Sequence, residues 1–178
     1  NFTLSAESTD PPNILFFFED DQRNDTLGVA GHSIVRTPTI DRLANQGVRF
    51  TNMFVSHSIY WVSRTSILRG LTARSFGQPE KPDDARPDAV STLFTDLLKE
   101  AGYRTSFYGK WHAKMPKDHF DEYEPIFRNP YFKDQTDSSK RHTTELIADC
   151  GIKFIKSQPM NQPFQLNLWF NVAHAEDR

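Results

Sequence analysis

The sequence predicts a single α/β domain with a mostly parallel central sheet flanked by helices. Short apolar runs typical of strands alternate along the chain with segments of helical periodicity, and this alternation favours parallel pairing. With 178 residues, of which 37% are hydrophobic, the chain can bury one core but is short for two domains. We divide it into a polar leader, residues 1–12, and one domain over residues 13–178.

The first expected elements are a buried strand, a helix and a second strand. NILFFF, residues 13–18, is a nearly continuous apolar run that indicates a strand buried on both faces of the sheet. In TPTIDRLANQG, residues 37–47, Thr37 is an expected N-cap and Pro38 takes the first helical position. VRFTNMFV, residues 48–55, alternates enough to predict a strand.

The later elements continue the alternation, each with its own sequence signal. Glycines end two of the expected helices, three prolines and many charges mark an exposed loop, and a period of two marks the last strand. A long polar and aromatic stretch is expected to be an irregular excursion facing the substrate. In chain order these elements are a helix over 63–70, a loop over 77–90, a helix over 90–102, a strand over 103–112, the excursion over 113–141, a helix over 143–156 and a strand over 163–174.

Composition and charge exclude several classes of function. The net charge is −2 and the basic residues are scattered, so we expect no nucleic-acid partner. The single cysteine, Cys150, excludes an intrachain disulfide and a Cys-rich zinc site. No apolar run approaches the roughly 20 residues of a membrane-spanning helix, so no transmembrane segment is expected.

Charged residues follow three of the expected strands at the point where each strand ends. Open α/β sheets bind their ligands at these carboxyl ends. Asp20 and Asp21 follow the first strand, where a turn would let their carboxylates converge on a hard cation such as Ca²⁺ or Mg²⁺. The alternative for an acidic pair is a solvated loop or a helix cap.

Cationic and imidazole side chains accompany the carboxylates. Lys110 and His112 are two apart in an extended segment and share one face, which suits an anionic ester. Arg64 begins a helix, where it could hold an anion. The alternatives are exposed surface residues for the pair and a solvated arginine for Arg64, while His174 alone is more typical of a structural histidine.

The order of these segments resembles the N-terminal part of the catalytic domain of the sulfatase family, within the alkaline-phosphatase-like superfamily. PNILFFFEDDQRNDTLG is similar to the opening strand with its metal-binding aspartates, and TPTIDRLANQGVRFTNMF to the segment that follows. AGYRTSFYGKWH resembles the Lys-x-His strand, and FNVAHA the stretch with a further histidine. The resemblance runs from Pro12 to His174 and implies an alkaline-phosphatase-like fold. Because relatives carry further metal ligands and another lysine downstream, we expect this chain to be a fragment of a longer polypeptide.

The family's nucleophile signature departs from the pattern at its first residue. The signature is Cys (or Ser)-x-Pro-Ser-Arg-x-x-x-Leu-Thr-Gly, and the first residue is oxidised to formylglycine. This chain reads YWVSRTSILRG, with Val62 for proline, Arg69 for threonine and Tyr60 for the nucleophile precursor. Tyrosine cannot be converted to the aldehyde, because its Cβ carries a ring. Ser58 and Ser63 do not replace it, since neither takes the place of the lost residue.

The resemblance implies a sulfate ester hydrolase that uses a divalent metal, usually Ca²⁺, and a hydrated formylglycine. The roles it implies are metal ligands for Asp20 and Asp21, support of the formylglycine for Arg64, and sulfate binding and proton transfer for Lys110, His112 and His174. Expected partners are a sulfated small molecule or glycan and, in relatives with Cys or Ser, a maturation enzyme. Relatives are commonly exported.

Two other functions stay open at this stage. Because Tyr60 removes the nucleophile, the first is a catalytically silent sulfatase-like protein that binds sulfated glycans or a partner. The second is a phosphoesterase, which Tyr60 disfavours.

Overall fold

The computed structural model describes residues 10–76, 92–111, 117–127 and 130–174. Most of the predicted leader and the whole predicted loop over 77–90 lie outside these residues.

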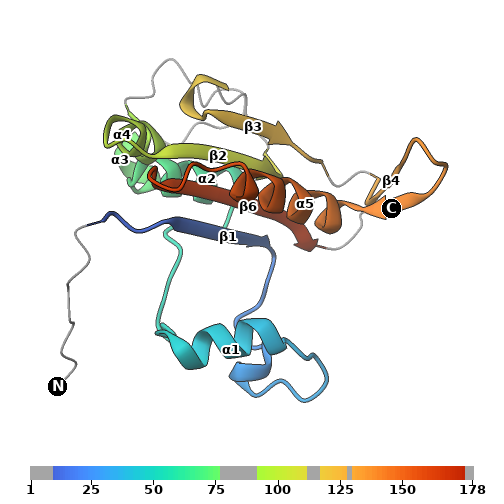
Figure 1. Ribbon diagram of the computed structural model, residues 1–178. Helices are drawn as coiled ribbons and strands as arrows, with labels where there is room; N and C mark the ends of the chain where they lie inside the picture. Colours follow the sequence, from blue (N-terminus) through green and yellow to red (C-terminus); the bar gives the residue numbers. More distant parts are fainter. Residues whose placement is uncertain (1–9, 77–91, 112–116, 128–129, 175–178) are drawn as a thin grey trace.

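The central sheet has four parallel strands in the described part of the chain (Figure 1). They are β1 (Ile14–Asp20), β6 (Phe164–Ala173), β2 (Arg104–Gly109) and β3 (Glu122–Pro125), named in their order across the sheet. Every neighbouring pair is parallel. A separate antiparallel ribbon joins β4 (Phe132–Asp134) to β5 (Lys140–His142). The predicted α/β class with a parallel sheet is therefore confirmed.

Helices cover both faces of the sheet. In Figure 1, α5 lies on one face, while α2, α3 and α4 lie on the other. No helix in the described residues is long and apolar enough to cross a membrane. The helical elements are η1 (Gly28–Ala30), α1 (Pro38–Gln46), α2 (Tyr60–Arg69), α3 (Ala73–Phe76), α4 (Phe94–Glu100), η4 (Lys117–His119) and α5 (Thr143–Lys156). The predicted bounds of α5 are confirmed.

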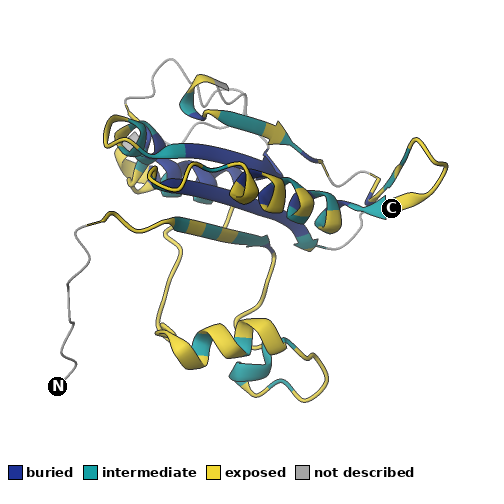
Figure 2. Cartoon of the chain, viewed as in Figure 1, coloured by how far each residue is buried: buried dark blue, intermediate teal, exposed yellow. Residues whose placement is uncertain are grey.

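Most of the core lies in two apolar layers that β6 separates, and a smaller buried cluster lies at α2 and α3. Because side chains alternate along a strand, Leu166 and Leu168 pack toward α5 while Trp169 packs toward α2 and α4. On the α5 side they meet Ile147 and Phe154. Figure 2 shows β2 and β6 as the most buried part of the sheet. β2 and β6 are thus held firmly by the core, which fixes the position of the sheet edge formed by their carboxyl ends.

The first predicted strand forms, but its predicted burial on both faces is wrong. The side chains of β1 alternate between partly buried and exposed, and Phe17 keeps 53% of its surface exposed. β1 is an edge strand of the described sheet, and α5 packs over β6 and β2 instead of over β1. Among the described residues, one face of β1 is therefore less covered than the faces of the central strands.

Residues 48–55 do not form the predicted strand. They have no strand assignment, and their apolar side chains are exposed, including Phe50 and Phe54. An alternating pattern yields a strand only where a neighbouring edge accepts its hydrogen bonds, and no described strand pairs with this segment.

The predicted excursion over 113–141 contains regular structure. β3 extends the sheet by pairing with β2, and Tyr123 stacks on Phe107 with ring centroids 5.5 Å apart. β4 and β5 also fall in or at the end of this stretch. Strands of three or four residues, rich in charge, carry too little pattern to be predicted without their partners.

Burial on α5 provides a test of the packing. Phe154 is fully buried against β6, whereas Ile152, two residues earlier on the same helix, is 50% exposed. We expect Phe154→Ala to lower the free energy of unfolding by about 3–5 kcal/mol. The control Ile152→Ala should change it by less than about 0.5 kcal/mol. Urea denaturation followed by circular dichroism measures both, and equal losses would contradict the arrangement.

Candidate functional site

Three parallel strands end at one edge of the sheet, and each is followed by or ends in a predicted site residue. β1 ends at Asp20, Lys110 directly follows β2, and His174 directly follows β6. Parallel pairing brings the carboxyl ends of these strands together, as in other open α/β sheets. The strand ends therefore assemble charged groups that are up to 154 positions apart in the sequence.

Asp20 binds two cationic side chains at the centre of this edge. Its Oδ1 accepts a hydrogen bond from Nη2 of Arg64 at 3.1 Å, and its Oδ2 accepts one from Nζ of Lys110. Asp20 is 5% exposed, Arg64 1% and Lys110 2%. Because an unpaired buried charge is very costly, these three groups stabilise one another. Two positive charges against one negative charge leave the cluster with a net charge of +1.

Arg64 is not the solvated arginine of the alternative interpretation. Its guanidinium carbon lies 5.8 Å from the centre of the Phe18 ring and 5.7 Å from that of Trp169. Burial lowers its pKa, and the charges of Asp20 and Asp21 oppose that change. Its Nε and Nη1 are buried and make no hydrogen bond. Arg64 is therefore held by aromatic rings on its faces and keeps unused donor capacity.

Tyr60 is the first residue of α2 and lies against the same cluster. The N-cap, Ile59, makes no side-chain capping bond. The Tyr60 ring centre is 5.8 Å from Nζ of Lys110, a distance typical of a cation–π contact. Tyr60 is 44% exposed, in contrast to the buried lysine. A partly exposed aromatic ring therefore lies against the buried Lys110 ammonium.

Asp21 and His174 form a second, more exposed pair beside the buried cluster. Asp21 has a left-handed backbone with φ of 59°, a conformation that aspartate tolerates better than most residues. Nε2 of His174 lies 3.6 Å from Oδ2 of Asp21. The turn at the end of β1 leaves the Asp20 side chain buried and directs the Asp21 side chain toward His174. His112 lies outside the described residues, so the predicted pairing of Lys110 with His112 on one face stays a prediction.

Two residues that sequence reasoning did not select support the site. The Tyr131 hydroxyl donates a hydrogen bond to the carbonyl oxygen of His174 at 2.7 Å, and no local pattern indicates this contact. Gly109 has φ of 121°, and a Cβ there would lie 1.9 Å from the carbonyl oxygen of Trp169. The amide of Lys110 donates to that same oxygen at 2.8 Å. A glycine at a strand end just before a predicted site lysine is a signal that could have been used.

The fit of the described residues to a metal ion is incomplete. Ca²⁺ takes six to eight oxygen ligands, and the aspartates are suitable donors in kind. Both oxygens of Asp20 already accept from Arg64 and Lys110. No group of three or more His, Cys, Asp or Glu side chains is arranged to hold a metal within the described ranges. These residues do not form a complete metal site by themselves.

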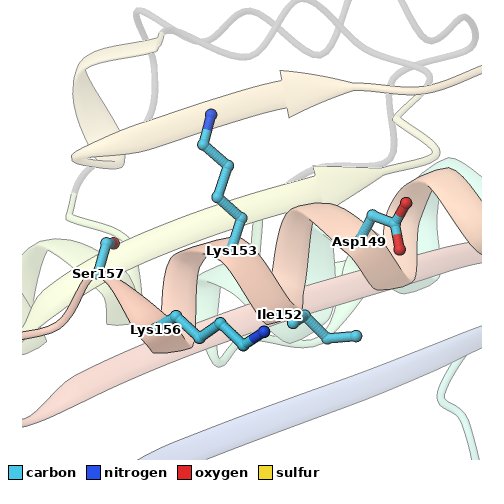
Figure 3. A pocket seen from close by; sticks show the side chains of 5 residues that line it. All are labelled: Asp149, Ile152, Lys153, Lys156 and Ser157. Carbon is cyan, nitrogen blue, oxygen red and sulfur yellow. The ribbon is translucent and has the colours of Figure 1, made fainter.

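Two hollows formed by described residues elsewhere on the molecule contain none of the predicted site residues. One of about 430 Å³ lies on α5, where Figure 3 shows Ile152 and Lys156 alongside one another and Lys153 pointing away from them. Another, of about 460 Å³, is lined by residues that include Glu124 and Cys150. Burial raises the pKa of Cys150 to about 11, so this thiol is protonated at neutral pH and is a poor nucleophile. The charged cluster at the strand ends therefore remains the candidate site.

The fold and this site define an alkaline-phosphatase-like α/β protein with buried cations at the carboxyl ends of its strands. The sulfatase profile matches residues 12–177, and the chain belongs to the sulfatase family. It is 30% identical over 168 residues to an N-acetylglucosamine-6-O-sulfatase of Bacteroides thetaiotaomicron, covering 89% of this chain and 30% of that protein. Human N-acetylgalactosamine-6-sulfatase is 27% identical and is matched over 93% of this chain and 40% of its own length.

The solved structures give the same assignment. A protein solved in complex with its substrate D-glucosamine-2-N,6-O-disulfate superimposes with a TM-score of 0.79 at 27% identity. The match covers 92% of this chain and 35% of that protein. This chain thus spans about a third of the length of the relatives that it matches.

Asp20 and Asp21 provide the first test of the site. Asp20→Asn leaves two buried cations without their counter-charge, and we expect a loss of about 3–5 kcal/mol in the free energy of unfolding. Asp21→Asn removes only an exposed pair and should cost less than about 1 kcal/mol. Urea denaturation of the two variants decides between a buried cluster and two equivalent solvated carboxylates.

Gly109 provides the second test. Gly109→Ala places a Cβ against the backbone of β6, so we expect a loss of more than about 4 kcal/mol in stability. Gly102, with φ of 89° and open space around it, is the matched control. Gly102→Ala should cost about 1–2 kcal/mol, the penalty of the left-handed conformation alone. Thermal unfolding measures both, and equal costs would show that the strands do not approach so closely.

Proposed function

We propose that this chain provides the sulfate-binding part of a sulfatase-type site for sulfated glycans. The observation that carries the proposal is the pair of buried cations, Arg64 and Lys110, which converge at the carboxyl ends of β1 and β2. Arg64 lies in the second turn of α2 and Lys110 contacts Tyr60, the first residue of that helix, and a helix N-terminus favours anions. The relatives are named as sulfatases for amino-sugar 6-sulfates, which supports glycans as the substrate class.

The proposed roles follow from the positions of the side chains. Lys110 neutralises the charge of the sulfate group, which it reaches when its contact with Tyr60 opens. Arg64 supports the residue at position 60. Its Nε and Nη1 atoms, which now make no hydrogen bond, would donate hydrogen bonds to a bound anion. His174, paired with Asp21, is placed to move a proton at the rim of the site. His112 is proposed for sulfate binding from its sequence position alone.

The metal belongs to the proposal as well. Sulfatases generally use a divalent metal, and we propose Ca²⁺, with Mg²⁺ as the other hard cation that carboxylates suit. Asp20 and Asp21 would be two of its ligands. The remaining oxygen ligands would come from outside the described residues, because two carboxylates are too few. We assign no catalytic step to the metal in this structure.

Catalysis requires a nucleophile that this chain does not carry. Formylglycine forms from Cys or Ser, and a tyrosine side chain cannot yield it. Tyr60 therefore favours a second candidate function, a catalytically silent protein that binds sulfated glycans. A phosphoesterase is disfavoured for the same reason, since it needs a Ser or Thr nucleophile at this position. We also propose export, by family resemblance, and a maturation enzyme as partner only for variants with Cys or Ser at position 60.

Restoring the nucleophile tests the proposed function. In the full-length protein that carries this chain, Tyr60→Cys is co-expressed with the maturation enzyme, and formylglycine is verified by mass spectrometry. We expect hydrolysis of an aryl sulfate or of a 6-sulfated amino sugar to rise at least about 1,000-fold over the Tyr60 protein. Tyr60→Ala, which cannot be oxidised to the aldehyde, is the matched control and should stay inactive.

The outcomes separate the two candidate functions. Verified formylglycine without any gain in hydrolysis would reject the hydrolase site. In that case, binding of sulfated saccharides that Lys110→Met weakens would support the silent binding protein. Binding that Lys110→Met leaves unchanged would reject both.

A further inference from the structure

We propose that Tyr60 is a cover for the anion site, whose ring occupies the side of the Lys110 ammonium at which an anionic ester would bind. The proposal rests on the proposed function, because it takes the cluster of Asp20, Arg64 and Lys110 to be an anion site. It concerns a different property, namely whether the site is open in the chain as it stands.

The described contacts of the buried Lys110 ammonium include one carboxylate and one aromatic ring. Its ammonium binds Oδ2 of Asp20 on one side and faces the Tyr60 ring, 5.8 Å away, on another. Although Lys110 follows a strand end, where ligands reach open α/β sheets, it is only 2% exposed. A lysine that binds a ligand from solvent needs an accessible ammonium. The enclosure therefore indicates a closed state.

Tyr60 is more exposed to solvent than the charged groups of the cluster that it contacts. Of the groups in contact with the two cations, Asp20 is 5% exposed and Trp169 is fully buried, whereas Tyr60 is 44% exposed. The partly exposed ring thus lies between the buried core of the cluster and the surface, in contact with the Lys110 ammonium, and we take it as the cover. Truncating it would leave the backbone of α2 in place, because residue 60 is only the first position of the helix.

The Tyr60 ring excludes an anion by its size and also repels it electrostatically. The face of an aromatic ring is electron-rich, so it attracts an ammonium and repels a sulfate at the same position. A contact of this kind is worth about 2- to 30-fold in an equilibrium constant. Once the ring is absent, a sulfate would meet the Lys110 ammonium beside the Arg64 guanidinium, which has two unused donors, with Asp20 and the neighbouring Asp21 as the opposing charges.

Titration of inorganic sulfate by isothermal calorimetry tests the cover. We expect Tyr60→Ala to bind sulfate at least about tenfold more tightly than the unmodified protein. Tyr60→Phe is the matched control, because it keeps the ring and loses only the hydroxyl, and it should bind as weakly as the unmodified protein. The double variant Tyr60→Ala with Lys110→Met should lose the gain.

Sulfate binding by the unmodified protein that equals that of Tyr60→Ala would overturn the proposal, as would a gain that survives Lys110→Met. A second measurement needs no variant. Carbamylation by cyanate should modify Lys110 at least about tenfold more slowly than Lys140, whose side chain is 66% exposed. Equal rates in the folded protein would also overturn the cover.

The result is distinguishable from that of the hydrolysis experiment. If sulfate binding rises in Tyr60→Ala but the formylglycine-containing protein hydrolyses no ester, the cover is retained and the hydrolase is rejected. Hydrolysis by the formylglycine form, with no gain of sulfate binding in Tyr60→Ala, would retain the hydrolase and reject the cover.

Discussion

The carboxylate of Asp20 is the interaction on which the candidate site depends. It joins the end of β1 to α2 through Arg64 and to the end of β2 through Lys110. Each partner alone would be a buried, uncompensated charge, whose cost in a low-dielectric interior is several kcal/mol. In the sheet β6 lies between β1 and β2, so the contact of Asp20 with Lys110 spans the end of β6. The ion cluster therefore ties together two strands that are not neighbours in the sheet.

An aromatic layer makes this arrangement specific. Trp169 and Phe18 enclose the Arg64 guanidinium, and Phe107 packs on Trp169 at 5.1 Å between ring centroids. Such a layer excludes water from the back of the site and strengthens the electrostatic attraction to Asp20. Gly109 brings the backbone of Lys110 onto that of Trp169, so the lysine and the aromatic layer share one anchor. The positions of both cations are set by the core and not by flexible surface loops.

The sequence predicted those features that depend on local pattern or on the ends of elements. The long amphipathic helix α5, the apolar run of β1 and the charged residues that follow strands all carry such signals. The failures have a common physical cause, which is dependence on a partner. Residues 48–55 alternate like a strand but find no edge to pair with, whereas the four residues of β3 form a strand because β2 offers one. The burial of Arg64 likewise depends on rings distant in the sequence.

Position 60 links the chemistry of the site to its stability. A pocket for an anionic ester gains its affinity from cations whose charge is incompletely balanced, and such cations destabilise the empty protein. In this chain the Tyr60 ring contacts the Lys110 ammonium and offsets part of the cost of burying its charge. The core rings of Phe18 and Trp169 do the same for Arg64. The contact of the Tyr60 ring with the Lys110 ammonium therefore also stabilises the site without a ligand. In the silent binding protein that we propose as the second candidate function, these cations would serve both as structural partners of Tyr60 and Asp20 and as the groups that bind the sulfated ligand.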